Sequence, residues 1–205
     1  RIHLAGDDSP RELVLPVPGE HMALNALAAL IAVRDYGGDV SEALEALTHF
    51  GGVNRRFQYH GHVGGIRVYD DYAHHPTEAR AVLTAAREVA DADAQGLGHP
   101  GRVIVCFQPH LFSRTEQFAE EFAKALDLAD YAIVLDIYGA REKPIPGVTS
   151  ELITTQLTIP HKYQPDFSKV PYDVAAIAEP GDIVLTMGAG NVTMEADAVI
   201  ALLKG

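Results

Sequence analysis

The hydrophobic pattern at the start of the chain predicts helix more clearly than strand. Residues 22–36 are almost wholly apolar and rich in Ala and Leu, a composition that favours a buried helix. The preceding stretch 13–21 has a short apolar run interrupted by two prolines. Because proline cannot donate to a strand ladder, we expect only a short, broken strand there.

A second helix is predicted over residues 40–50, where leucines and a phenylalanine recur at helical spacing. Ser41 is placed to cap this helix. Gly51 and Gly52 then end the pattern, and the hydrophobic period changes after them. We therefore predict two domains, residues 1–52 and residues 53–205.

Beyond this boundary the pattern predicts a hairpin and then alternating helices and strands. Stretches 57–63 and 66–70 flank Gly64 and Gly65, which favours a hairpin. Continuous apolar strands between amphipathic helices are typical of a Rossmann-like α/β fold, with a mostly parallel sheet and helices on both faces. Helices are expected over about 76–91, 115–129, 149–156, 171–178 and from about 192, and strands over 103–107, 131–138 and 183–187.

Composition narrows the classes of function. Hydrophobic residues make up 47% of the 205, which is enough for a core, and no apolar run is long enough to cross a bilayer. Sixteen Lys and Arg residues against 28 Asp and Glu residues give a formal net charge of −12, which argues against a nucleic-acid partner. A small anionic ligand held by a few local cations stays compatible with this charge.

The single cysteine, Cys106, excludes an internal disulfide framework and fits a reducing cytoplasm. It lies in the apolar run 103–107, which favours a buried structural thiol over a nucleophile. The chain begins with Arg1 and not with Met, so we interpret it as a piece of a longer chain.

Three polar clusters follow three predicted strands directly. They span residues 69–75, 108–115 and 188–191. In an open parallel sheet the carboxyl ends of the strands lie at one edge, beside the amino ends of the helices, and ligands collect there. We therefore expect these clusters to meet at a single rim.

The first cluster has two interpretations. Asp70, Asp71, His74 and His75 are of types that bind metals. Adjacent histidines rarely point at one ion, however, and the same residues could form a solvated loop with a helix cap. We predict no metal site here.

The other polar residues also leave alternatives open. His110 and Arg114 could hold an anion or form a surface ion pair. The 188–191 turn, GAGN, could contact a dinucleotide or could simply be a tight turn. Asn25, in its apolar helix, could be a satisfied core amide or an amide that reads a base.

No phosphate-cradling motif of the form GxxxxGK(S/T) occurs in the chain. Any nucleotide chemistry that the chain serves must therefore be completed elsewhere.

Six motifs together resemble the Mur ligases of peptidoglycan synthesis, and they occur in order over nearly the whole chain. They are GEHMALNALAAL at 19–30, GVNRRFQ at 52–58, DDYAHHPTE at 70–78, FQPHLFSRT at 107–115, YGAREKPIPG at 138–147 and VLTMGAGN at 184–191. The resemblance implies that residues 1–52 are the helical tail of a central ATP-binding domain and that residues 53–205 are the carboxy-terminal ligase domain. It also implies a role in cell-wall formation, and with it in cell shape and division.

The resemblance implies an ATP- and Mg²⁺-dependent reaction. The muramoyl carboxylate of UDP-N-acetylmuramate is phosphorylated, the amine of L-alanine attacks the acyl phosphate, and phosphate leaves. A related ligase that recycles muramoyl tripeptide shares the aspartate–histidine motif. The stretches 55–58 and 138–147 favour the alanine-adding member.

The resemblance also assigns residues to the nucleotide. It implies that Asn25 meets the adenine, while Arg56 and Asp71 lie near the ribose and phosphates. ATP and Mg²⁺ would be bound mainly by the central and amino-terminal domains that this chain lacks. Those domains would be its partners, and the chain alone is expected to be inactive.

The other carried-over residues face the substrates. They line the amino-acid and muramoyl end of the cleft, with His74 and Arg114 as the catalytic pair: Tyr72, His74, His75, His110 and Arg114. Two positions depart from the family pattern, because Met22 stands where Asn is common and Leu111 where Arg is common.

Two hypotheses from other functional classes compete with the ligase hypothesis. One is a nucleotide-binding domain without catalysis. The other is a metal-dependent hydrolase that uses His74 and His75.

Overall fold

The computed structural model describes residues 1–4, 9–92 and 101–204 of the chain. The chain divides into two compact units, Arg1–Val53 and Asn54–Gly205. In the described part of the chain, no helix combines the length and the apolar character needed to span a membrane. The division lies one residue from the boundary expected after residue 52. The identity of the first unit as the end of an ATP-binding domain stays a prediction.

The first unit contains the two predicted helices, α1 (Glu20–Asp35) and α2 (Val40–Thr48), which pack against each other. The expectation of a buried α1 is wrong. Its buried residues form one stripe at helical spacing, Met22, Ala26 and Leu30, because α2 covers one side of the helix only.

Two local predictions in this unit are also wrong. Residues 13–18 form no strand, because prolines at 16 and 18 have no N–H to donate. The α2 cap is Asp39 and not Ser41: the Asp39 carboxylate accepts the backbone N–H of Ser41 at 2.7 Å and that of Glu42 at 3.3 Å.

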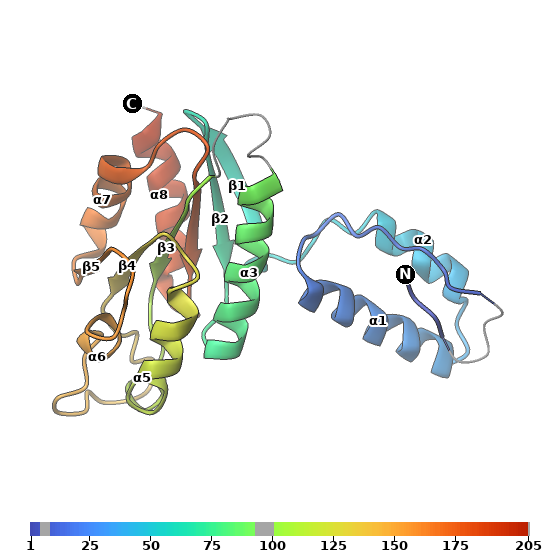
Figure 1. The fold of residues 1–205 in the computed structure, drawn as a ribbon. Coiled ribbons are helices and arrows are strands. Elements are labelled where there is room, and N and C mark those ends of the chain that lie inside the picture. The colour runs from blue at the N-terminus through green and yellow to red at the C-terminus, as the bar shows by residue number, and fades with distance from the viewer. Residues whose placement is uncertain (5–8, 93–100, 205) are drawn as a thin grey trace. The chain divides into compact units, whose positions relative to one another are not determined.

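The second unit is built on a six-stranded sheet in the order β1-β2-β6-β3-β4-β5 (Figure 1). The β1–β2 pair is the predicted hairpin, whose Gly64 and Gly65 adopt φ of 58° and 83°. All other strand pairs are parallel, which confirms the predicted fold class. The strands are β1 (Gln58–Val63), β2 (Ile66–Asp71), β3 (Val103–Phe107), β4 (Tyr131–Leu135), β5 (His161–Gln164) and β6 (Ile183–Met187).

Helices cover both faces of this sheet. Strand β3 shows the division, because Val105 and Phe107 belong to one apolar cluster and Ile104 and Cys106 to the other. The first cluster packs under α3 (Pro76–Ala92), α5 (Phe112–Leu126) and α6 (Glu151–Thr154). The second packs under α7 (Val170–Ile177) and α8 (Met194–Leu203), which lie behind the sheet in Figure 1. Short 3-10 turns, η1 (Phe167–Lys169) and η2 (Asn191–Thr193), precede α7 and α8.

Several boundaries differ from the predicted ones. Strand β5 was not predicted because its sequence, HKYQ, is polar and largely exposed at the edge of the sheet. Helix α5 begins at Phe112 instead of residue 115, and β4 ends at Leu135 instead of 138. The helix expected over 149–156 is a single turn, α6.

Candidate active site

The three polar turns meet at one rim, as predicted. The parallel register sets the last residues of the central strands side by side, with Met187 of β6 between Asp71 of β2 and Phe107 of β3. Backbone hydrogen bonds continue this alignment past the strands. The Gly188 N–H donates to the Asp71 carbonyl at 3.0 Å, and the Gln108 N–H donates to the Met187 carbonyl at 2.9 Å.

Residues from three loops form one cluster at this rim. The Arg114 guanidinium donates to the His74 carbonyl at 3.3 Å and lies 3.4 Å from Nδ1 of His110. The rings of His74 and His110 meet edge to face with centroids 5.6 Å apart, and Tyr138 stacks on the other side of His110 at 5.8 Å. The structure therefore brings together His74, His110 and Arg114 and adds Tyr138.

The environment of His110 favours its neutral form. Partial burial lowers the pKa of His110, and the neighbouring His74 and Arg114 lower it further against a smaller opposing effect of Glu142. A neutral imidazole beside a guanidinium can accept a proton while the guanidinium holds an anion.

The start of α3 fixes His74 and His75. The Glu78 carboxylate accepts the backbone N–H of both histidines, at 3.0 and 3.2 Å, and so caps the helix. Nδ1 of His74 lies 3.0 Å from the Tyr72 carbonyl. The His75 ring packs edge to face against Phe118 at 5.1 Å. The interpretation of this cluster as a solvated loop is wrong for the two aspartates, because Asp70 and Asp71 are buried at the end of β2. The helix cap exists, but Glu78 supplies it from outside the cluster, and the His74 ring lies at the rim.

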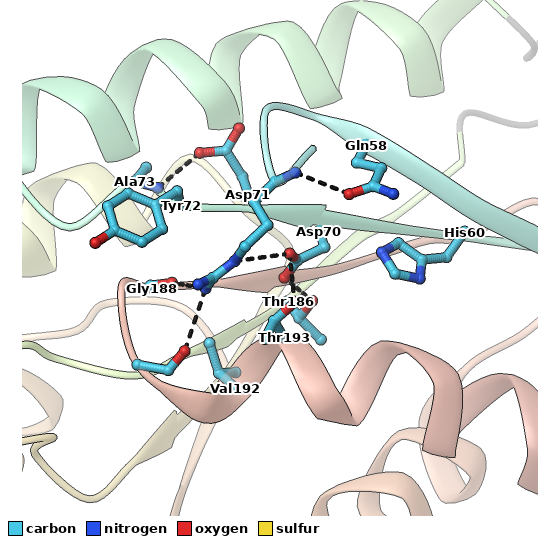
Figure 2. Close-up of polar contacts among 12 residues, drawn as sticks. Gln58, His60, Asp70, Asp71, Tyr72, Ala73, Thr186, Gly188, Val192 and Thr193 are labelled. Atoms are coloured by element: carbon cyan, nitrogen blue, oxygen red, sulfur yellow. Dashed lines mark hydrogen bonds and ion pairs between the residues drawn. The ribbon is translucent and has the colours of Figure 1, made fainter. Parts of the chain in front are cut away.

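Asp71 is buried, with 1% of its surface exposed. One of its oxygens accepts the backbone N–H of Ala73 at 2.7 Å (Figure 2). The other accepts the backbone N–H of Phe57, also at 2.7 Å. Burial raises the pKa of Asp71 to about 6, although the two backbone hydrogen bonds and the charge of Arg56 act in the opposite direction. Because this carboxylate is buried and already paired, it does not fit a direct contact with ribose hydroxyls, and its expected place near the ribose and phosphates stays a prediction.

Arg56 and Asn25 are the other two residues that the resemblance assigns to a nucleotide. Arg56 is exposed, and its guanidinium carbon lies 5.6 Å from the centre of the Tyr72 ring. Asn25 is exposed on α1, which overturns its interpretation as a core amide. Among the described residues, no group of three or more His, Cys, Asp or Glu side chains is placed to hold a metal.

Sequence analysis considered Asp70 only as a metal ligand or loop residue and gave Arg55 no role, so it missed their buried ion pair. Asp70 is fully buried on the opposite side of β2 from Asp71 and accepts the hydroxyls of Thr186 and Thr193 at 2.7 Å each (Figure 2). Nε of Arg55 donates to the same carboxylate at 3.2 Å. Because successive side chains of a strand face opposite ways, the Asp70–Asp71 pair was the signal that could have indicated two separate roles.

The 188–191 turn is a tight structural turn. A Cβ on Gly190 would lie 2.1 Å from Oε1 of Gln108, and one on Gly188 would lie 2.6 Å from the Gln108 carbonyl oxygen. The buried Gln108 amide also donates to Asn191 at 3.0 Å and accepts the Val192 N–H at 3.2 Å. Glycine is therefore required because β6 and β3 approach closely at their ends.

Leu111, one of the two departures from the family pattern, lies at the start of α5 with a φ of 74°. Its N–H donates to the Tyr138 carbonyl at 2.9 Å, which ties the loop after β4 to the rim. Cys106 is fully buried, and burial raises its pKa, so it is the structural thiol that the sequence predicted.

Comparison with known proteins identifies related chains. Residues 55–190 match the family described as Mur ligase, glutamate ligase domain. The UDP-N-acetylmuramate–L-alanine ligase of Rhodococcus opacus is 55% identical over 211 residues, which cover 100% of this chain and 42% of that protein. The chain thus spans less than half the length of this relative.

Solved structures show the same architecture. The UDP-N-acetylmuramate-alanine ligase of Thermotoga maritima superposes with a TM-score of 0.74 at 31% identity, over 94% of this chain and 40% of that one. A murein peptide ligase of Psychrobacter arcticus superposes with a TM-score of 0.67 at 24% identity, over 94% and 39%. The second of these similarities concerns the fold alone.

Proposed function

The chain belongs to the Mur ligase family, and we propose that it is part of an ATP-dependent ligase that joins L-alanine to UDP-N-acetylmuramate. The observation that carries the proposal is the cluster of His74, His110 and Arg114 at the rim where β2, β3 and β6 end. The names of the relatives, at 55% and 31% identity, indicate the alanine-adding reaction.

The chemistry of the cluster suits the attack of an amine on an acyl phosphate. Arg114 can hold a carboxylate or a phosphoryl oxygen through its fork of N–H donors. His110, kept neutral by its surroundings, can take the proton that the alanine nitrogen gives up as its bond to the acyl carbon forms. Tyr72, His74 and His75 complete the side of the cleft that receives the amino acid and the muramoyl group.

ATP with Mg²⁺ supplies the phosphoryl group that activates the muramoyl carboxylate. The contribution of this chain would come from Arg56 toward the phosphates and from Asn25 toward the adenine. Asp71 would act indirectly, because it accepts the N–H of Phe57 and so fixes the residue next to Arg56. The phosphate loop, the remaining nucleotide contacts and the metal ligands would come from central and amino-terminal domains outside this chain, in a cytoplasmic enzyme of peptidoglycan synthesis.

The test is a phosphate-release assay on the complete protein that carries this chain. With ATP, Mg²⁺ and UDP-N-acetylmuramate, we expect phosphate release that depends on L-alanine and is not supported by a peptide such as the tripeptide of cell-wall recycling. The 205-residue chain alone should release none. ATP binding without turnover in the complete protein would indicate a binding module, and preference for the peptide would indicate the recycling ligase.

A further inference from the structure

Arg55 has no role in the sequence analysis, although its side chain contacts several parts of the rim. Its side chain is 25% exposed, and its Nε pairs with the fully buried Asp70 at 3.2 Å. Its Nη2 donates to the carbonyls of Gly188 at 2.5 Å and Gly190 at 3.2 Å. One guanidinium thus joins the end of β2 to the turn that follows β6.

The backbone of Arg55 makes two more connections. Its carbonyl accepts the N–H of Tyr72 at 2.7 Å, and its N–H donates to Oε1 of Gln58 at 2.8 Å. Arg55 has a φ of 59°, a conformation that a non-glycine residue holds only when its surroundings determine it. The hydrogen bonds of the Arg55 N–H and carbonyl hold the backbone in this conformation.

The guanidinium also touches the substrate side of the rim. Its carbon lies 4.7 Å from the centre of the Tyr72 ring, and the Tyr72 ring meets the His74 ring edge to face at 5.2 Å. His74 in turn meets His110, so a chain of ring contacts leads from Arg55 to the proposed proton acceptor.

We propose that Arg55 is a positioning residue, which sets the Tyr72 and His74 rings for the amino-acid substrate by tying them to Asp70 and to the 188–190 turn. This inference rests on the proposed function. Catalysis is sensitive to displacements of about 1 Å in the groups that orient a substrate, so loss of these ties should reduce turnover without loss of the fold.

Two substitutions in the complete protein separate the effect of the positive charge from that of the guanidinium group. Arg55→Lys keeps the charge and removes the guanidinium, whereas Arg55→Gln removes both. A lysine can pair with the Asp70 carboxylate. Its side chain is shorter and ends in one ammonium group, so it cannot also bind the Gly188 and Gly190 carbonyls and cover the Tyr72 ring. We expect Arg55→Lys to melt within a few degrees of the unmodified protein, with kcat/KM for L-alanine reduced at least about fivefold and KM for ATP within about twofold. Arg55→Gln should show at least the same loss. Arg80→Gln, on the exposed side of α3, is the matched control.

The proposal would be overturned if both Arg55 variants had the same kcat/KM for L-alanine as Arg80→Gln, measured per folded molecule. A second measurement does not depend on activity. Amide exchange of the 205-residue chain should be at least about tenfold faster at Tyr72 and Gly188 in Arg55→Gln than in Arg80→Gln. Unchanged amide exchange would overturn the positioning role of Arg55, whatever the activity of the complete protein. If the unmodified complete protein ligated no alanine, that result would contradict the proposed function and not the positioning role.

Discussion

The carboxylate of Asp71 accepts the backbone N–H of Phe57 at 2.7 Å, and this bond ties the end of β2 to the segment with which the second unit begins. Asp70, the preceding residue, binds the same segment from the other face of the sheet, because its carboxylate pairs with Arg55. Two neighbouring carboxylates therefore hold one short stretch of chain from opposite sides. This arrangement explains why the DDY motif carries two aspartates.

Asp71 should make the stability of the chain depend on pH. Burial raises its folded pKa from 3.8 to about 6, so the folded state binds this proton more tightly than the unfolded state. The resulting stabilisation is complete below pH 3.8 and is lost as the pH rises through about 6. The difference between the two pKa values corresponds to about 3 kcal/mol.

The measurement is urea unfolding of the unmodified chain and of Asp71→Asn between pH 4 and pH 7.5. The unmodified chain should lose about 2.5 kcal/mol relative to Asp71→Asn over this range, because only its side chain ionises and a small part of the loss has already occurred at pH 4. Parallel profiles for the two proteins would show that Asp71 does not carry the effect.

His110 should titrate below its ordinary value because burial and the neighbouring His74 and Arg114 lower its pKa. Arg114→Ala removes the guanidinium charge and should raise the midpoint of the His110 titration. Both can be read from NMR titration of the His110 ring, with Arg80→Ala as the control. A midpoint that does not move in Arg114→Ala would mean that the guanidinium does not act on His110.

Arg114→Ala in the complete protein should reduce kcat/KM for the ligation by about 100-fold, since a preorganised cation at a developing negative charge is typically worth this much. Helix α5 should remain intact, because among the described residues the Arg114 side chain forms polar contacts with the His74 carbonyl and the His110 ring and with no backbone group of α5. The variant is compared with Arg80→Ala in steady-state kinetics and thermal melting. Equal kinetics in the two variants would remove Arg114 from the proposed mechanism.

Gly188→Ala should destabilise the chain by at least about 2 kcal/mol, because the new methyl group would meet the Gln108 backbone carbonyl at 2.6 Å and the residue has a φ of 148°. Backbone atoms cannot swing aside as a side chain can. Gly51→Ala, where no atom lies within 4 Å of the added carbon, is the control in urea unfolding. A loss of stability no larger than that of the control would contradict the close approach of β3 and β6.

The alternation of apolar strands and amphipathic helices was enough to predict the fold class, because burial on both faces of a parallel sheet leaves a continuous apolar run. Strands β3 and β6 were predicted at their observed bounds, residues 103–107 and 183–187. The short polar edge strand β5 carries no such run and could not be predicted. In the same way, the polar turns after the predicted strands indicated one rim, since parallel strands end on the same side.

The sequence by itself indicated that the polar turns after the strands meet at one rim and which family motifs they belong to, because both depend on local spacing. Tertiary structure decided how they are used. Arg55 reaches the Gly188 carbonyl across 133 positions of sequence, and Asp71 turns inward to backbone N–H groups instead of outward to a ligand. Those choices depend on the register of β2 against β6 and on the positive φ of Arg55, which are properties of the folded chain and leave no periodic pattern in the sequence.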